Sequence, residues 1–163
     1  MRQRGFTLLE ILVVVAIIAI LSAALMLSAG GAGSDRQIED EAQRMQQVLR
    51  LLCDEAVIEG RYAGFGYAAQ MYAGYEFGPQ GWQPVKHQGP LQAHTLVLGL
   101  GLRELGSAEA LPRALPEDPQ VLCTPAGELG DHDLLLSVEG VREGWRLTLD
   151  KSGTSQLSAW QPP

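Results

Sequence analysis

The sequence has 163 residues, 46% of them hydrophobic, and a formal net charge of −7 at pH 7. This length is typical of a single domain, and the negative charge disfavours nucleic acid and anionic lipid as partners of a soluble domain because both are negative themselves. Two cysteines are too few for a disulfide scaffold, and their spacing is not that of metal ligands.

Most of the uninterrupted hydrophobicity lies near the N-terminus. An almost continuous apolar run covers 6–29 and follows Arg2 and Arg4. As a helix, this run is long enough to cross a bilayer core of roughly 30 Å, and arginines ahead of it favour a cytoplasmic N-terminus. The pattern predicts a single-pass anchor, with the rest of the chain on the far side of the membrane.

A removable secretory signal would show the same features, with the small residues at 28–30 as its cleavage site. Glu10 argues against this alternative. A carboxylate costs about 2.5–3.5 kcal/mol at the centre of a membrane span and less near an end, and a disposable signal has no need of it. An exported soluble enzyme or binding protein, with a mature chain that starts near Gly30, stays open as the alternative of a different class.

The segment Gly5-Phe6-Thr7-Leu8-Leu9-Glu10 resembles the class III signal of type IV pilins and pseudopilins. The resemblance implies that 1–5 is a leader peptide, that a prepilin peptidase cleaves between Gly5 and Phe6, and that the new N-terminal residue is N-methylated. It also implies that Glu10 acts in fibre assembly.

The chemistry of this segment supports the same interpretation. Cleavage creates a cationic amine at Phe6, and an amine and a carboxylate in a low-dielectric layer attract each other while each is costly alone. Glu10 can therefore pair with the amine of its own chain or with that of a neighbouring subunit. A solitary glutamate that reaches towards the membrane interface is the simpler alternative.

A small-residue segment at 30–33 follows the apolar run, and its glycines predict a break, bend or flexible joint. The periplasmic domain is expected to cover 34–163. Its first part, about 35–59, is predicted to be an amphipathic helix that packs on the domain's own sheet and ends near Gly60. The apolar stripe of this helix consists of Ile38, Ala42, Met45, Leu49, Leu52 and Ala56.

Beyond Gly60 the pattern changes to short aliphatic and aromatic runs separated by Gly and Pro, which predicts β-structure over about 61–160. The predicted strands are 62–68, 71–77, 82–85, 120–124, 134–138, 145–150 and 154–159. Turns are predicted at 78–81 and 150–153. The run 96–102 fits a strand or a short helix, and the Pro-containing segment after it fits a loop. The expected fold class is α+β, with a long N-terminal helix packed on antiparallel sheet.

The same region narrows the family. The relevant segments are Leu49, Leu52 and Ala56 ahead of Gly60-Arg61, then Tyr75-Glu76-Phe77 with Trp82, then 121–129, and finally 147–153. Together they resemble the GspH-type minor pseudopilin of the type II secretion system, within the type IV pilin-like superfamily. Cys123 departs from the family pattern, because relatives tend to carry a large apolar residue there. A minor pilin of a type IV pilus or competence system shares the fold and stays open as an alternative.

The resemblance implies a non-enzymatic subunit of the periplasmic pseudopilus that links its tip complex to the major-pseudopilin shaft. The implied partners are the major pseudopilin, the tip-complex minor pseudopilins, the prepilin peptidase, the inner-membrane assembly platform and inner-membrane lipid. The implied location is the bacterial inner membrane, with the C-terminal domain in the periplasm. Nucleic acid is not expected, since the tail 152–163 has no Lys or Arg, and no cofactor is expected.

Catalytic and metal-binding patterns are weak. The histidines His87, His94 and His132 are isolated in the sequence, and no nucleophile motif accompanies them. The closely spaced acids Glu128, Asp131 and Asp133 could bind calcium, but solvated loop acids are the commoner case, so no metal is expected.

The pairing of Cys53 and Cys123 is open at this stage. A bridge across so long a loop could contribute up to about 4 kcal/mol. It requires Cα atoms within roughly 7 Å, and Cys53 lies at the edge of the apolar stripe. Unpaired thiols are therefore the favoured prediction.

Overall fold

The structure is a computed structural model that describes residues 8–86, 89–97 and 99–162, with the side chains of 23–35 left out of the description. The chain divides into two compact units, Met1–Gln37 and Ile38–Pro163. A long helix, α1 (Leu8–Glu59), contributes residues to both units.

The backbone of α1 is helical at 30–33, so the helix has no break at the predicted joint. Glycine costs about 1 kcal/mol in a helix relative to alanine, but it can adopt the helical conformation. A bend or a flexible joint at 30–33 stays a prediction.

The part of α1 in the second unit is amphipathic, as predicted. All six residues of the predicted stripe are buried, and Val48 is buried beside them. The helix ends at Glu59 and is followed by Gly60, where φ is +63°. Arg61 N–H donates to Ala56 O and Gly60 N–H donates to Val57 O, which is the Schellman arrangement that satisfies the last carbonyls of a helix.

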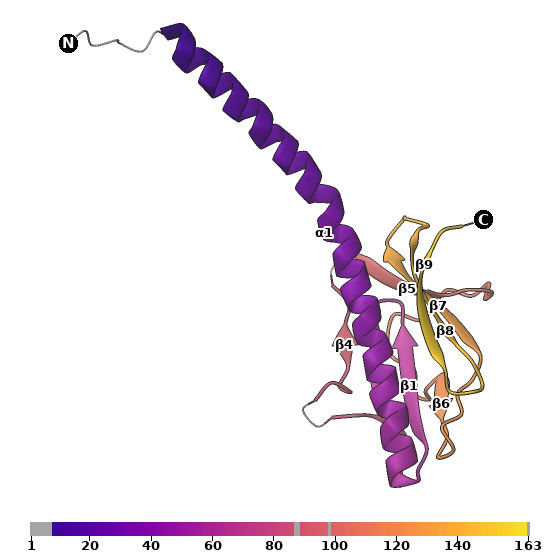
Figure 1. Cartoon of the computed structure of the whole chain (residues 1–163). Helices are drawn as coiled ribbons and strands as arrows, with labels where there is room; N and C mark the ends of the chain where they lie inside the picture. Colours follow the sequence, from indigo (N-terminus) through magenta and orange to yellow (C-terminus); the bar gives the residue numbers. More distant parts are fainter. Residues whose placement is uncertain (1–7, 87–88, 98, 163) are drawn as a thin grey trace. The chain divides into compact units, whose positions relative to one another are not determined.

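Two antiparallel sheets make up the rest of the second unit (Figure 1). The first sheet has the strand order β3-β2-β1-β6, and β4 also pairs with β2. Its strands are β1 (Ala63–Ala68), β2 (Met71–Gly78), β3 (Gly81–Pro84), β4 (His94–Thr95) and β6 (Val121–Cys123). The second sheet has the order β5-β7-β8-β9. Its strands are β5 (Leu100–Glu104), β7 (His132–Val138), β8 (Gly144–Leu149) and β9 (Ser155–Trp160).

The predicted α+β class is confirmed, and each of the seven predicted strands is present with small shifts at its ends. The run 96–102 becomes β5 only from Leu100 onward. The sequence did not predict β4, since two residues carry no periodicity. Both predicted turns are present: Gly78 pairs with Gly81, and Asp150 N–H donates to Thr154 O across the second turn.

The outer face of the first sheet, which points away from α1, is partly covered by the loop between β5 and β6. Pro119 packs directly on Gly64, where an added Cβ would lie 2.3 Å from the Pro119 ring. Tyr75 crosses Gly66 in the same way, and its hydroxyl donates to Pro116 O at 2.6 Å. The two glycines are therefore required by close approach of ring atoms rather than by backbone conformation.

The core lies between α1 and the inner faces of both sheets, and its cluster of buried residues begins at Ile38. Figure 1 shows this part of α1 with β4 on one side and β9 on the other. Side chains of α1 reach both: Glu41 contacts His94 of β4, while Gln46 Nε2 donates to Ser155 O of β9 at 2.8 Å. Arg50 Nε donates to Ser155 Oγ at 3.1 Å.

Cys53 of α1 and Cys123 of β6 form a disulfide, with Cα atoms 5.2 Å apart. The prediction of unpaired thiols is therefore wrong. Leu122 points to the outer face of the first sheet and is exposed, so the next residue, Cys123, points inward and is fully buried. The edge of the apolar stripe, where Cys53 lies, is the part of α1 that faces the edge strand β6. Spacing along the helix alone could not reveal this.

Candidate functional site

The predicted processing residues Gly5 and Phe6 lie outside the described residues. Glu10, the predicted assembly residue, lies in the first turn of α1 with an exposed side chain. The geometry of the predicted amine–carboxylate pair is thus not part of the structure, and the pair stays a prediction.

The described side chains at the start of α1 form an apolar arm on all sides of the helix. Every large hydrophobic residue between 8 and 21 is exposed, from 86% at Leu8 to 46% at Val14, and Glu10 is the charged residue among them. A helix that is hydrophobic all round is normally covered by protein or lipid. The arm is therefore a surface that requires a partner.

Among the residues that the structure describes, no helix combines the length and the apolar character that a membrane crossing requires. Residues 6 and 7 of the predicted span, and its side chains from 23 onward, lie outside the description.

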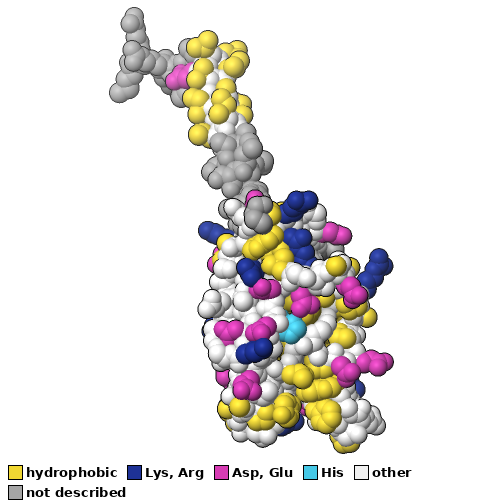
Figure 2. All heavy atoms as spheres, turned by 90° about the vertical axis from the view of Figure 1, so that its right-hand side faces the viewer, with side chains coloured by type: hydrophobic (Ala, Val, Ile, Leu, Met, Phe, Trp, Pro, Cys, Tyr) yellow, Lys and Arg dark blue, Asp and Glu magenta, His cyan; other side chains and the backbone are white. Residues whose placement is uncertain are grey.

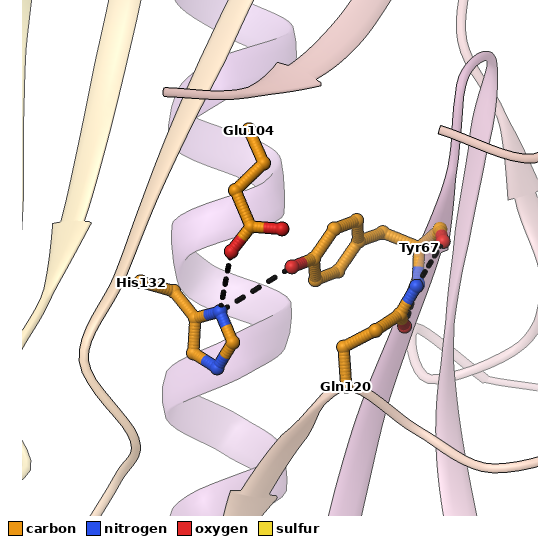
Figure 3. Close-up of polar contacts among 4 residues, drawn as sticks. All are labelled: Tyr67, Glu104, Gln120 and His132. Carbon is orange, nitrogen blue, oxygen red and sulfur yellow. Dashed lines mark hydrogen bonds and ion pairs between the residues drawn. The ribbon is translucent and has the colours of Figure 1, made fainter. Parts of the chain in front are cut away.

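A polar cluster joins the two sheets of the second unit (Figure 3). His132 of β7 approaches Glu104 of β5, with 2.9 Å between Nδ1 and Oε1, and the same nitrogen lies 3.4 Å from the hydroxyl of Tyr67 on β1. When Nδ1 carries hydrogen it donates to the carboxylate, and the phenol oxygen is a second, longer contact. The side chain of Gln120 forms two hydrogen bonds with the backbone of Tyr67. Its Oε1 accepts from the N–H at 2.9 Å, and its Nε2 donates to the carbonyl at 2.7 Å.

The environment keeps Tyr67 protonated. Burial raises the pKa of its phenol far above the usual value, and the charge of Glu104 raises it further. A phenol in this state is a hydrogen-bonding group and not a nucleophile. Within the described residues, neither His132 nor His94 is hydrogen-bonded to a serine, threonine or cysteine side chain. The cluster is thus suited to holding the two sheets together.

A second pair joins α1 to the first sheet. Glu41 of α1 is almost fully buried, and one of its carboxylate oxygens lies 2.9 Å from His94 Nε2. The ring of Tyr72 packs 5.2 Å from the His94 ring. Burial, and then the charge of Glu41, raises the pKa of Tyr72, whose hydroxyl forms no hydrogen bond within the described residues. The sequence did not predict either His–Glu pair, because the partners are 53 and 28 residues apart in the chain.

The acids considered as calcium ligands do not converge. Asp133 is bound to Arg146 through both oxygens, at 2.9 and 2.6 Å, and Thr148 donates to it at 2.8 Å. Asp131 pairs with Lys151 at 3.3 Å. Within the described residues, no group of three His, Cys, Asp or Glu side chains is placed to hold a metal ion. His87, the third histidine, lies outside the description.

The chain is similar to known proteins over almost its whole length. Residues 1–26 match the family model described as the prokaryotic N-terminal methylation motif. The chain is 35% identical over 159 residues to type II secretion system protein H of Pseudomonas aeruginosa. The aligned region covers 93% of this chain and 92% of that protein. Over 174 residues the chain is 32% identical to the protein of the same name from Aeromonas hydrophila, covering 96% and 93% of the two chains.

The fold is shared as well. The structure of the minor pseudopilin EpsH from the type 2 secretion system of Vibrio cholerae matches with a TM-score of 0.62 at 25% identity, covering 76% of this chain and 97% of that chain. The match includes the arrangement described above, with a helix packed on antiparallel sheets.

Proposed function

Since the chain belongs to the type II secretion system protein H family and is a minor pseudopilin, we propose that it enters the periplasmic pseudopilus and links its tip complex to the major-pseudopilin shaft. The observation that carries the proposal is the apolar arm of α1, which is exposed on all sides and lies within the residues 1–26 that match the methylation motif. An arm of this kind requires a surrounding of lipid or of other apolar helices. The role proposed is structural and not enzymatic.

Maturation is proposed to start at Gly5. A prepilin peptidase cleaves between Gly5 and Phe6 and methylates the new amine, as the match of 1–26 to the methylation motif supports. Before assembly, the mature helix anchors the chain in the inner membrane, with the domain from residue 34 onward in the periplasm. Arg2 and Arg4, on the cytoplasmic side of the apolar run, favour this orientation.

Assembly is proposed to move the arm from lipid into the core of the fibre. There the Phe6 amine and the Glu10 carboxylate of neighbouring subunits can pair, because each charge is costly alone in an apolar surrounding. The proposed partners are the other pseudopilins, the prepilin peptidase and the inner-membrane assembly platform.

Replacement of Glu10 tests the assembly step. Glu10→Leu and Glu10→Gln should be processed and membrane-bound, yet incorporated poorly into pseudopili, because both remove the partner of the amine. Ser22→Leu is the matched control, since it makes the same helix more apolar and keeps the carboxylate. Fractionation of sheared pseudopili against membranes, with immunodetection of the chain, measures the effect. Wild-type incorporation of both Glu10 variants would show that the pairing is not needed.

Replacement of Gly5 tests the processing step and separates the two function classes. Gly5→Val should accumulate as the full-length precursor, because a branched side chain obstructs the close backbone approach that glycine allows at the scissile bond. The mass of the wild-type N-terminus gives a second readout. A methylated Phe6 supports the pseudopilin maturation, whereas a chain that starts near Gly30 would identify an exported soluble protein.

A further inference from the structure

An exposed aromatic patch lies on the outer face of the first sheet. It consists of Tyr62, Phe77, Trp82 and Leu122, of which Phe77 is the most exposed at 61%. The patch lies at the end of the second unit where α1 finishes, and the chain enters this unit from the opposite end, at Ile38. Figure 2 shows hydrophobic side chains gathered at the end where α1 finishes, with acidic side chains beside them.

The register of the first sheet brings the members of the patch together. Phe77 pairs with Trp82 across β2 and β3, and their rings lie 5.1 Å apart. Leu122 of β6 pairs with Gly64 of β1. Because Gly64 has no side chain, the Trp82 ring extends over it, 3.3 Å from the position of an added Cβ. The indole thereby lies between Phe77 and the Pro119 ring, which also packs on Gly64, the backbone partner of Leu122.

Acidic side chains lie at two borders of this apolar centre, and one of them, Glu76, points to the α1-facing side of β2 at the edge of the patch. Glu76 and Phe77 line the same cavity of about 400 Å³ beside the β2–β3 turn. Glu117 and Asp118 are exposed and directly precede Pro119, which packs on Gly64 beside the indole. Within the described part of the chain, none of these three acids forms an ion pair, while Arg61, the cation in the wall of the cavity, is paired with Glu59.

We propose that the aromatic patch docks a neighbouring pseudopilin through a surface that presents apolar side chains flanked by Lys or Arg. An apolar centre with a polar rim is the usual anatomy of a protein interface, and unpaired acids in the rim select a basic partner. The identification of the partner as a pseudopilin rests on the function proposed above. A second copy of this chain would bring a like-charged rim against the first, and anionic lipid would be repelled in the same way.

Photo-crosslinking in cells with the complete secretion system tests the proposal on the full chain. A benzoylphenylalanine at position 77 should give an adduct with one other pseudopilin. The same probe at position 141 should give no adduct. Val141 is comparably exposed, at 46%, but it lies in the turn between β7 and β8 of the second sheet. An adduct between two copies of this chain, an adduct with an exported protein, or equal adducts from both positions would overturn the proposal.

Pseudopilus fractionation shows whether a missing adduct contradicts the docking surface alone or the proposed function as well. A chain that fractionates with pseudopili but gives no adduct from position 77 overturns the docking surface alone. A chain that is absent from pseudopili overturns the proposed function and the docking surface together.

Binding of purified full-length variants to the crosslinked pseudopilin tests which side chains form the contact. Phe77→Ser should weaken binding by about tenfold or more, as expected for a central aromatic anchor. Glu117→Lys and Asp118→Lys should weaken binding and reduce its salt dependence, whereas Glu139→Lys, an exposed acid away from the patch, should change neither. Unchanged thermal unfolding midpoints verify that the variants are folded. Wild-type binding by Phe77→Ser, or tighter binding by Glu117→Lys, would contradict the proposal.

Discussion

Among the individual residues, Asp133 makes the stability of the fold depend on pH. Its carboxylate accepts hydrogen bonds from Arg146 and Thr148, and the bond from Arg146 holds the pKa of Asp133 below its usual value. A carboxylate with a lowered folded-state pKa stabilises the fold above its unfolded pKa, about 3.9, and this contribution is lost as the pH falls through the folded value. Asp133→Asn should therefore lower the free energy of unfolding at pH 7, and its difference from wild type should shrink as the pH falls below the unfolded pKa of about 3.9.

Denaturant unfolding of Asp133→Asn between pH 3 and pH 7 measures this difference. Asp131→Asn is the matched control, because Asp131 pairs with Lys151 at an exposed site where ion pairs contribute little. A difference between wild type and Asp133→Asn that stays constant down to pH 3 would contradict the assigned role of the carboxylate.

At the element scale, the disulfide fixes α1 to the edge strand of the first sheet. Cys53 and Cys123 are separated by 70 residues, so the bridge restricts a long loop of the unfolded chain. Replacement of both cysteines by alanine should cost about 2–4 kcal/mol in the free energy of unfolding. Denaturant unfolding of the oxidised wild type, the reduced wild type and the double variant measures the cost. The reduced wild type should resemble the variant, and a loss below about 1 kcal/mol would argue against the stabilising bridge.

The elements also show what a single sequence can and cannot predict. The stripe from Ile38 to Ala56 and the strands beyond Gly60 follow from periodicity, since one buried face of each element leaves a repeating pattern. The disulfide and the His94–Glu41 pair depend on which elements become neighbours. That information lies in the register of β6 and in the pairing of β4 with β2, neither of which has a local signal. The N-terminal motif can be identified from the sequence because its residues are consecutive in the chain.

Considered over the whole molecule, the described core residues all belong to the second unit. Its buried cluster runs from Ile38 to Leu149, and it is formed by α1 and both sheets together. A chain of residues 34–163 should therefore fold without the N-terminal arm and unfold in one cooperative transition. Far-UV circular dichroism reports on α1, and fluorescence reports on the three tryptophans, all of which lie in the β-structure. Coincident denaturant midpoints are expected, whereas separate midpoints would show that α1 is not part of the same cooperative unit.

The two attachments of α1 differ in mechanical strength. The helix is joined to the first sheet by a covalent bond at Cys53, but to the second sheet, at Ser155, by hydrogen bonds from Gln46 and Arg50. Tension applied along the helix is therefore transmitted to β6 through a covalent bond and to β9 through hydrogen bonds. Under tension, the hydrogen bonds at Ser155 are expected to break first, while the disulfide keeps the first sheet attached to the helix.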